Sequence, residues 1–65
     1  MTQEAAALLD QLDRIIRRDS DTQHRLRRRT EVLRRATLRL RVGQDPNVVR
    51  ALILSELPKI RLVQP

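Results

Sequence analysis

The chain has 65 residues and a formal net charge of +6; 34% of its residues are charged, and it contains no aromatic residue and no cysteine. This length allows one domain, residues 1–65, and the missing cysteines exclude disulfides, thiolate metal sites and thiol redox chemistry. With one histidine (His24), one glycine (Gly43) and no paired nucleophile and base, we expect no enzymatic activity, no metal and no cofactor. A core of this size supplies only about 3–5 kcal/mol, so we expect a partner protein or a homo-oligomer to complete it.

The first helix is predicted to begin after Thr2, an N-cap residue, with Glu4 in its first turn. From there one spacing of alternating four and three residues continues along the chain, as in a heptad repeat. We call these positions the heptad seam; it is apolar at both ends and polar in the middle. Its members are Ala5, Leu9, Leu12, Ile16, Asp19, Gln23, Leu26, Thr30, Leu33, Thr37 and Leu40.

The polar middle of the heptad seam leaves two interpretations open. No Gly or Pro interrupts residues 3–42, which favours one continuous helix about 60 Å long, possibly kinked near 19–22. In that helix Asp19 and Gln23 would interrupt burial and cost stability. However, Ser20-x-x-Gln23 fits a capping box, so the chain could break near residue 19 and restart near residue 21. We favour the continuous helix.

A tight turn at residues 43–46 is predicted to follow, because Gly43 suits the position after a helix C-terminus and Asp45-Pro46 suits the start of the next helix. The second helix covers about residues 47–57, and Pro58 ends it, leaving residues 58–65 as an irregular tail. The predicted fold is therefore all-α, a helical hairpin whose short apolar helix packs back on the long one. In a competing interpretation, residues 37–42 and 59–63 alternate as two strands around the short helix.

The second helix is more apolar than one buried face requires. Its predicted partner-binding face consists of Val49, Leu52, Ile53 and Leu57, and Val48, Ala51 and Leu54 widen it. We expect the surplus apolar surface to contact another polypeptide.

The positive charge is concentrated in residues 22–41, which carry a net charge of +7, against −2 for residues 1–21 and +1 for residues 42–65. Helical spacing places most of these arginines on one face, opposite Leu33 and Leu40, while Arg29 borders the heptad seam. This predicted arginine face is a candidate for phosphate contact. It consists of Arg25, Arg27, Arg28, Arg34, Arg35, Arg39 and Arg41.

The hypothesis we favour is a non-catalytic helical protein that acts by binding protein, as a regulator, adaptor or co-chaperone. The alternative is a basic protein that binds nucleic acid through the arginine face without sequence specificity, since no aromatic residue is present to stack on bases. The acidic start Met1-Thr2-Gln3-Glu4 and the short apolar runs predict neither a signal peptide nor a membrane span, so we expect a cytoplasmic location.

Residues 26–57 also show a resemblance to a known family. A long helix, the turn Gly43-Gln44-Asp45-Pro46 and an aliphatic second helix resemble the small co-chaperones of type III secretion needle subunits. The resemblance implies a helical hairpin that holds a partner protein. The chain departs from that family in its shorter second helix, in Pro58 and in the missing aromatic residues, and we do not assign it there.

Overall fold

The computed structural model of the chain describes residues 2–21 and 27–62, which contain three α-helices. These are α1 (Gln3–Ser20), α2 (Arg27–Arg41) and α3 (Pro46–Glu56). No strand occurs in this described part, so the all-α prediction is confirmed there. Of the two segments considered as strands, residues 37–41 belong to α2 and residues 59–62 have no regular structure.

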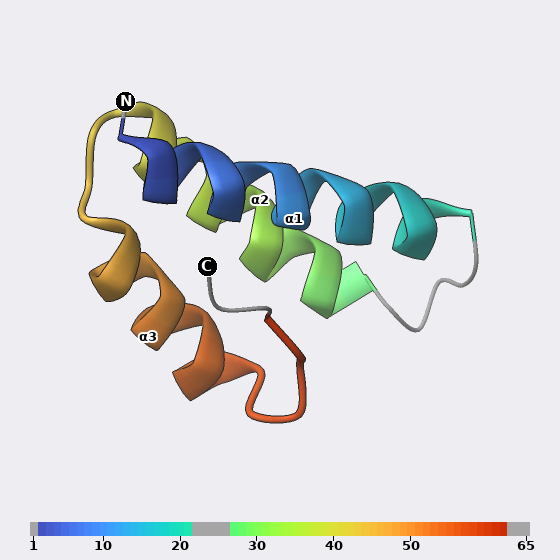
Figure 1. Cartoon of the computed structure of the whole chain (residues 1–65). Coiled ribbons are helices and arrows are strands. Elements are labelled where there is room, and N and C mark those ends of the chain that lie inside the picture. Colours follow the sequence, from blue (N-terminus) through green and yellow to red (C-terminus); the bar gives the residue numbers. More distant parts are fainter. Residues whose placement is uncertain (1, 22–26, 63–65) are drawn as a thin grey trace.

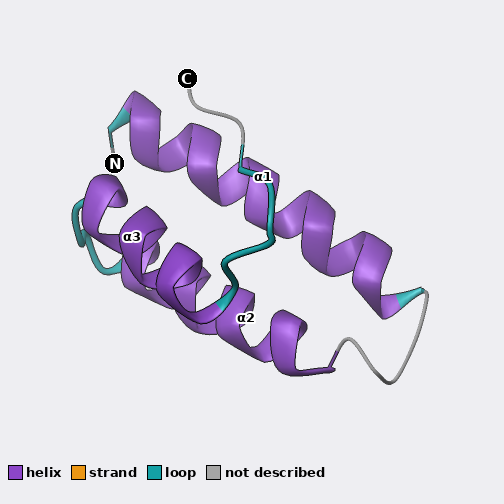
Figure 2. Cartoon of the chain, turned by 90° about the horizontal axis from the view of Figure 1, so that it is seen from below, coloured by secondary structure: helices purple, strands orange, loops and turns teal. Residues whose placement is uncertain are grey.

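The predicted continuous helix over residues 3–42 is wrong. Helix α1 ends at Ser20, α2 begins at Arg27, and α2 runs back along α1, so that the two helices lie side by side (Figures 1 and 2). The alternative interpretation correctly ends the first helix in the polar stretch near residue 19, but it restarts the helix near residue 21, whereas α2 begins at Arg27. Gln23, and with it the second half of the predicted capping box, lies outside the described residues.

The register of the heptad seam is nevertheless correct. Every one of its members that the structure describes is buried or half-buried: Ala5, Leu9, Leu12, Ile16, Asp19, Thr30, Leu33, Thr37 and Leu40. The two halves of the seam face each other within one chain instead of facing a second chain. A three-four spacing places residues on one side of any helix, so it holds for two short helices as well as for one long helix.

The predicted helix starts are confirmed by their caps. Thr2 Oγ1 accepts a hydrogen bond of 3.1 Å from the N–H of Ala5, and Asp45 Oδ1 accepts one of 2.8 Å from the N–H of Asn47. Each side chain satisfies a backbone donor that has no partner inside its helix. Pro46 follows Asp45 as the first residue of α3, where its fixed φ suits a helix and its missing N–H costs nothing.

Gly43 turns the chain from α2 into α3, as predicted. Its φ is +95°, which side chains with a Cβ rarely adopt. The N–H of Gly43 bonds to Leu40 O at 3.1 Å, and the N–H of Gln44 bonds to Arg39 O at 3.0 Å. This pair of bonds is the Schellman motif, which satisfies the last carbonyl groups of α2.

The core lies between the three helices, and its buried members are Ala5, Leu8, Leu12, Leu33, Ala36, Leu40, Val49 and Ile53. Helix α3 packs mainly on α2. After α3 the chain passes back toward α1 (Figure 2), and Ile60 and Leu62 of this tail pack against the core. The tail therefore covers core surface that a plain hairpin would leave open.

Candidate functional site

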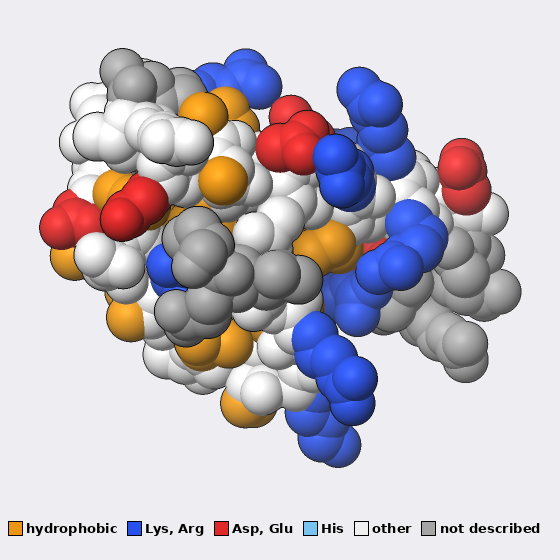
Figure 3. Space-filling view, in the orientation of Figure 1, with side chains coloured by type: hydrophobic (Ala, Val, Ile, Leu, Met, Phe, Trp, Pro, Cys, Tyr) orange, Lys and Arg blue, Asp and Glu red, His pale blue; other side chains and the backbone are white. Residues whose placement is uncertain are grey.

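The arginine face exists on α2. Six of its seven predicted members are exposed: Arg27, Arg28, Arg34, Arg35, Arg39 and Arg41; Arg25 lies outside the described residues. In the view of Figure 3, most of the visible Lys and Arg side chains lie over the half of the molecule where α1 ends and α2 begins. One arginine of this face, Arg35, is already paired with Glu31 at 3.1 Å. The face also contains an apolar residue, because Leu38, which is 63% exposed, lies among the arginines.

Arg29, which borders the heptad seam, forms an ion pair with Asp19 that the sequence did not predict. Its Nε and Nη2 atoms donate to Asp19 Oδ2 and Oδ1 at 2.6 and 2.5 Å, so the guanidinium grips the carboxylate with two parallel bonds. The Asp19 side chain is 1% exposed and that of Arg29 is 32% exposed. The hydrogen bonds that Arg29 donates to Asp19 raise the pKa of Arg29, and partial burial opposes this rise, so Arg29 stays charged throughout the range in which proteins are stable.

The position of this pair explains the polar centre of the heptad seam. Asp19 is near the end of α1 and Arg29 is near the start of α2, so their bond ties the two helices on either side of the connection. The expectation that Asp19 only interrupts burial is therefore wrong. Its carboxylate is buried with a partner, and this partner is brought to it by the turn of the chain.

The predicted partner-binding face of α3 is only partly accessible. Val49 is 0% exposed and Ile53 is 1% exposed, and both belong to the core of the chain itself. Leu57 is half-buried against that core, whereas Leu52 is 40% exposed. This corrects the prediction in part: the short helix packs back as expected, and this packing, together with the tail, covers Val49, Ile53 and part of Leu57, so that only Leu52 of the four is exposed.

The other side of α3 is exposed and carries no charge. We call it the outer face of α3; its residues are Asn47, Val48, Ala51, Leu52, Leu54 and Ser55. Val48, Leu52 and Leu54 are 45%, 40% and 39% exposed. A groove of about 210 Å³ between α2 and α3 borders this face, and Leu52, Arg35, Arg39 and Glu56 are among its lining residues. Three large apolar side chains thus lie on an uncharged surface beside a charged rim.

Arg50 is the one charged residue of α3 before Glu56, and it points inward. It is 7% exposed, and its Nε and Nη2 atoms are buried without any hydrogen-bond partner within the described part of the chain. Charged residues are ordinarily exposed, so the burial of Arg50 is a finding that the sequence pattern did not predict. Burying two guanidinium nitrogens without a partner is costly, and arginine is almost never fully buried in proteins unless it is paired.

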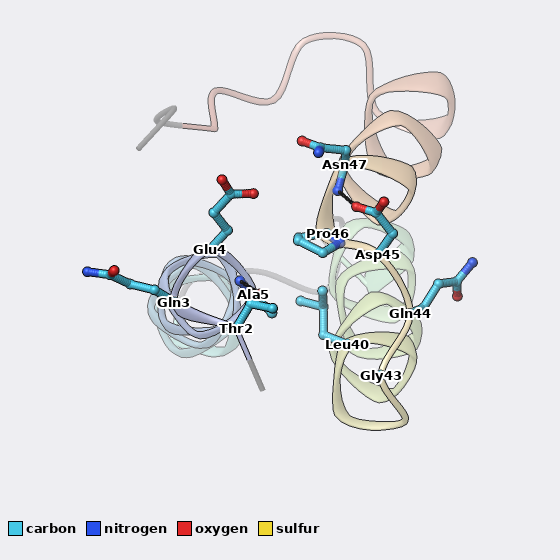
Figure 4. Close-up of a pocket in the computed structure, with 10 residues that line it drawn as sticks. All are labelled: Thr2, Gln3, Glu4, Ala5, Leu40, Gly43, Gln44, Asp45, Pro46 and Asn47. Carbon is cyan, nitrogen blue, oxygen red and sulfur yellow. Dashed lines mark hydrogen bonds between the residues drawn. The ribbon is translucent and has the colours of Figure 1, made fainter.

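A hollow of about 960 Å³ lies where the starts of α1 and α3 meet the end of α2 (Figure 4). Glu4 and Asp45 line it, and no basic side chain does. Asp45 already caps α3 and Thr2 already caps α1, so both side chains are engaged within the chain. We assign no ligand to this hollow.

His24 lies outside the described residues, as does Arg25. Within residues 2–21 and 27–62, no three His, Asp or Glu side chains come together where they could hold a metal ion. None of the helices in these ranges is both long and apolar enough to cross a membrane.

In comparisons with known proteins, no family model, no curated protein and no solved structure matches this chain.

Proposed function

We propose that this chain acts by binding another protein through the outer face of α3, as a non-catalytic regulator, adaptor or co-chaperone. The observation that carries the proposal is the absence of charge from this face in a chain of which 34% of the residues are charged. Protein interfaces are depleted of charge at their centre and have a polar rim. The outer face of α3 has this composition: its own residues carry no charge, and Arg35, Arg39 and Glu56 line the groove that borders it beside Leu52.

The size of the molecule adds support. A chain of this length without aromatic residues or disulfides has little core, and covering three partly exposed large side chains would add to the apolar area that is removed from water. A second copy of the chain and a different protein would both provide that cover. The arginine face of α2 cannot do the same between two copies, since like charges would meet.

We expect Leu52→Glu to weaken binding through this face while the chain stays folded. Leu52 is 40% exposed, so the new carboxylate remains hydrated in the free protein but must be desolvated in a complex. Self-association is measured by sedimentation over a concentration series, and binding to a different protein by affinity capture with the tagged full chain. We expect at least about a tenfold loss of affinity, the effect of roughly 1.4 kcal/mol.

The matched control is Leu38→Glu, the same change at an exposed leucine on α2. It should leave association unchanged and should melt at a similar temperature. If the two variants associate like the wild type, or if Leu38→Glu alone weakens association, the outer face of α3 is not the binding surface.

The second candidate function is contact with nucleic-acid phosphates by the arginine face, favoured by six exposed arginines on one helix. For duplex DNA we expect the logarithm of the binding constant to fall linearly with the logarithm of the salt concentration, with a slope of about −0.9 for each phosphate contacted. Arg34→Gln should make that slope less steep by about one contact. Arg14→Gln, at an exposed arginine on α1 that pairs with Asp10, is the control and should leave the slope unchanged. A binding constant independent of salt would exclude this function.

A further inference from the structure

The buried Arg50 calls for an explanation that the core does not give. On α3 it lies one turn after Pro46 and one turn before Ile53, both of which are buried, so the helix directs its side chain toward the core. Its Nε and Nη2 atoms have no partner within the described residues. A cation without a partner in such surroundings destabilises the free protein, which suggests that the arrangement is complete only when something else is bound.

Another arginine of the chain makes the pair of hydrogen bonds that Arg50 lacks. Arg29 uses its Nε and Nη2 atoms to hold both oxygens of the Asp19 carboxylate. These are the two atoms that are unpartnered in Arg50. They present two parallel N–H groups at the spacing of the two oxygens of a carboxylate, which is the strongest geometry for such a pair.

None of the carboxylates that hold other arginines is free to bind Arg50. Asp19 pairs with Arg29, Asp10 with Arg14 and Glu31 with Arg35. Asp45 is occupied as the cap of α3. The remaining four, Glu4, Asp13, Asp21 and Glu56, do not bond to the buried Nε or Nη2 of Arg50 either. A carboxylate for these two atoms is therefore best supplied by another molecule.

Arg50 also lies beside the outer face of α3. Asn47, three residues before it, and Leu54, four residues after it, are its neighbours on the helix surface, and both are exposed. A protein that covers the outer face would therefore reach the edge at which the Arg50 side chain begins. The long arginine side chain can turn toward that edge by changing rotamers, without movement of the helix.

We propose that Arg50 binds a carboxylate, an Asp or Glu side chain of the protein that covers the outer face of α3. This proposal rests on the proposed protein-binding function and adds the chemistry of the partner: an apolar surface with an acidic residue at its edge. A carboxylate fits better than a phosphate monoester, because one guanidinium neutralises a single charge, whereas a dianion would leave excess charge among aliphatic side chains.

The test uses the isotopically labelled full chain, with sodium acetate as the probe. In the nuclear magnetic resonance spectrum, the Nε–H signal of Arg50 should shift saturably with acetate at constant ionic strength, toward the position of the paired Arg29 Nε–H. The exposed Arg34 should show no saturable shift. Sodium chloride and inorganic phosphate should leave the Arg50 signal unchanged, and acetate should raise the melting temperature of the wild type because it binds only the folded state.

Arg50→Lys keeps the charge but not the paired donors, and should bind acetate at least about tenfold more weakly. Arg50→Met should show no melting shift with acetate. The proposal is overturned if the Arg50 and Arg34 signals respond alike, or if phosphate shifts the Arg50 signal and acetate does not. Leu52→Glu should retain the acetate response, so failure of the acetate site and failure of the α3 interface are distinguished by separate measurements.

Discussion

Arg29→Met is expected to unfold much of the chain at room temperature, although methionine is an unbranched side chain well suited to a helix. The change leaves the Asp19 carboxylate, whose side chain is 1% exposed, buried without its partner. Removing one partner of a buried ion pair typically costs about 3–5 kcal/mol. A single core of this size supplies about the same amount, so little net stability remains. Far-ultraviolet circular dichroism and urea denaturation of the wild type and the variant measure the loss.

Two further variants separate the ion pair from general packing. Asp19→Leu with Arg29→Met replaces both partners by apolar groups, and should recover most of the stability that Arg29→Met loses. Asp19→Leu alone should be less damaging than Arg29→Met, because Arg29 is 32% exposed and can turn into water. A wild-type urea midpoint for Arg29→Met would show that the two side chains do not meet in solution.

Leu33→Asp is expected to prevent folding, whereas Arg34→Asp, one residue further along, should change stability by less than about 0.5 kcal/mol. Leu33 is 0% exposed between the helices, so the substitution both leaves a cavity and buries a carboxylate without a partner. The cost is at least about 3 kcal/mol, close to the whole stability of a domain of this size. Arg34 is exposed, and its carboxylate replacement stays in water.

Thermal melts and helical content of the two variants check this prediction. Arg34→Asp also reduces the net charge of a chain at +6, which relieves some repulsion and keeps its expected effect small. Equal losses in the two variants would mean that α2 is rotated about its axis from the orientation described above.

Much of the local structure could be predicted from the sequence because it depends on residues close together in the chain. Thr2, Gly43 and Asp45 mark helix ends through bonds that span no more than five residues. The helical period fixes which residues share a side, and it correctly predicted the buried heptad seam and the exposed arginine face of α2. These features follow from backbone geometry and are the same whether or not the helix breaks.

The break itself could not be decided in this way. A heptad seam can be buried by a second chain along a continuous helix, or by the chain folding back on itself, and the periodicity of the two is identical. The contact that distinguishes them joins Asp19 to Arg29. On a continuous helix these two residues would be about 15 Å apart along the axis, too far for the bond that the structure contains.

The sequence by itself therefore determined the helical class, the starts of α1 and α3, the end of α2 and the side of each helix that is buried, because these depend on short-range geometry. Only the tertiary structure decided the direction of α2, the burial of Val49 and Ile53 in the chain's own core, and the inward position of Arg50. These features depend on which element covers a given side of a helix. Because hydrophobic burial is non-directional, an apolar residue packs equally well against its own chain or against another. Charged residues are ordinarily exposed, and the packing of α3 overrides this tendency at Arg50.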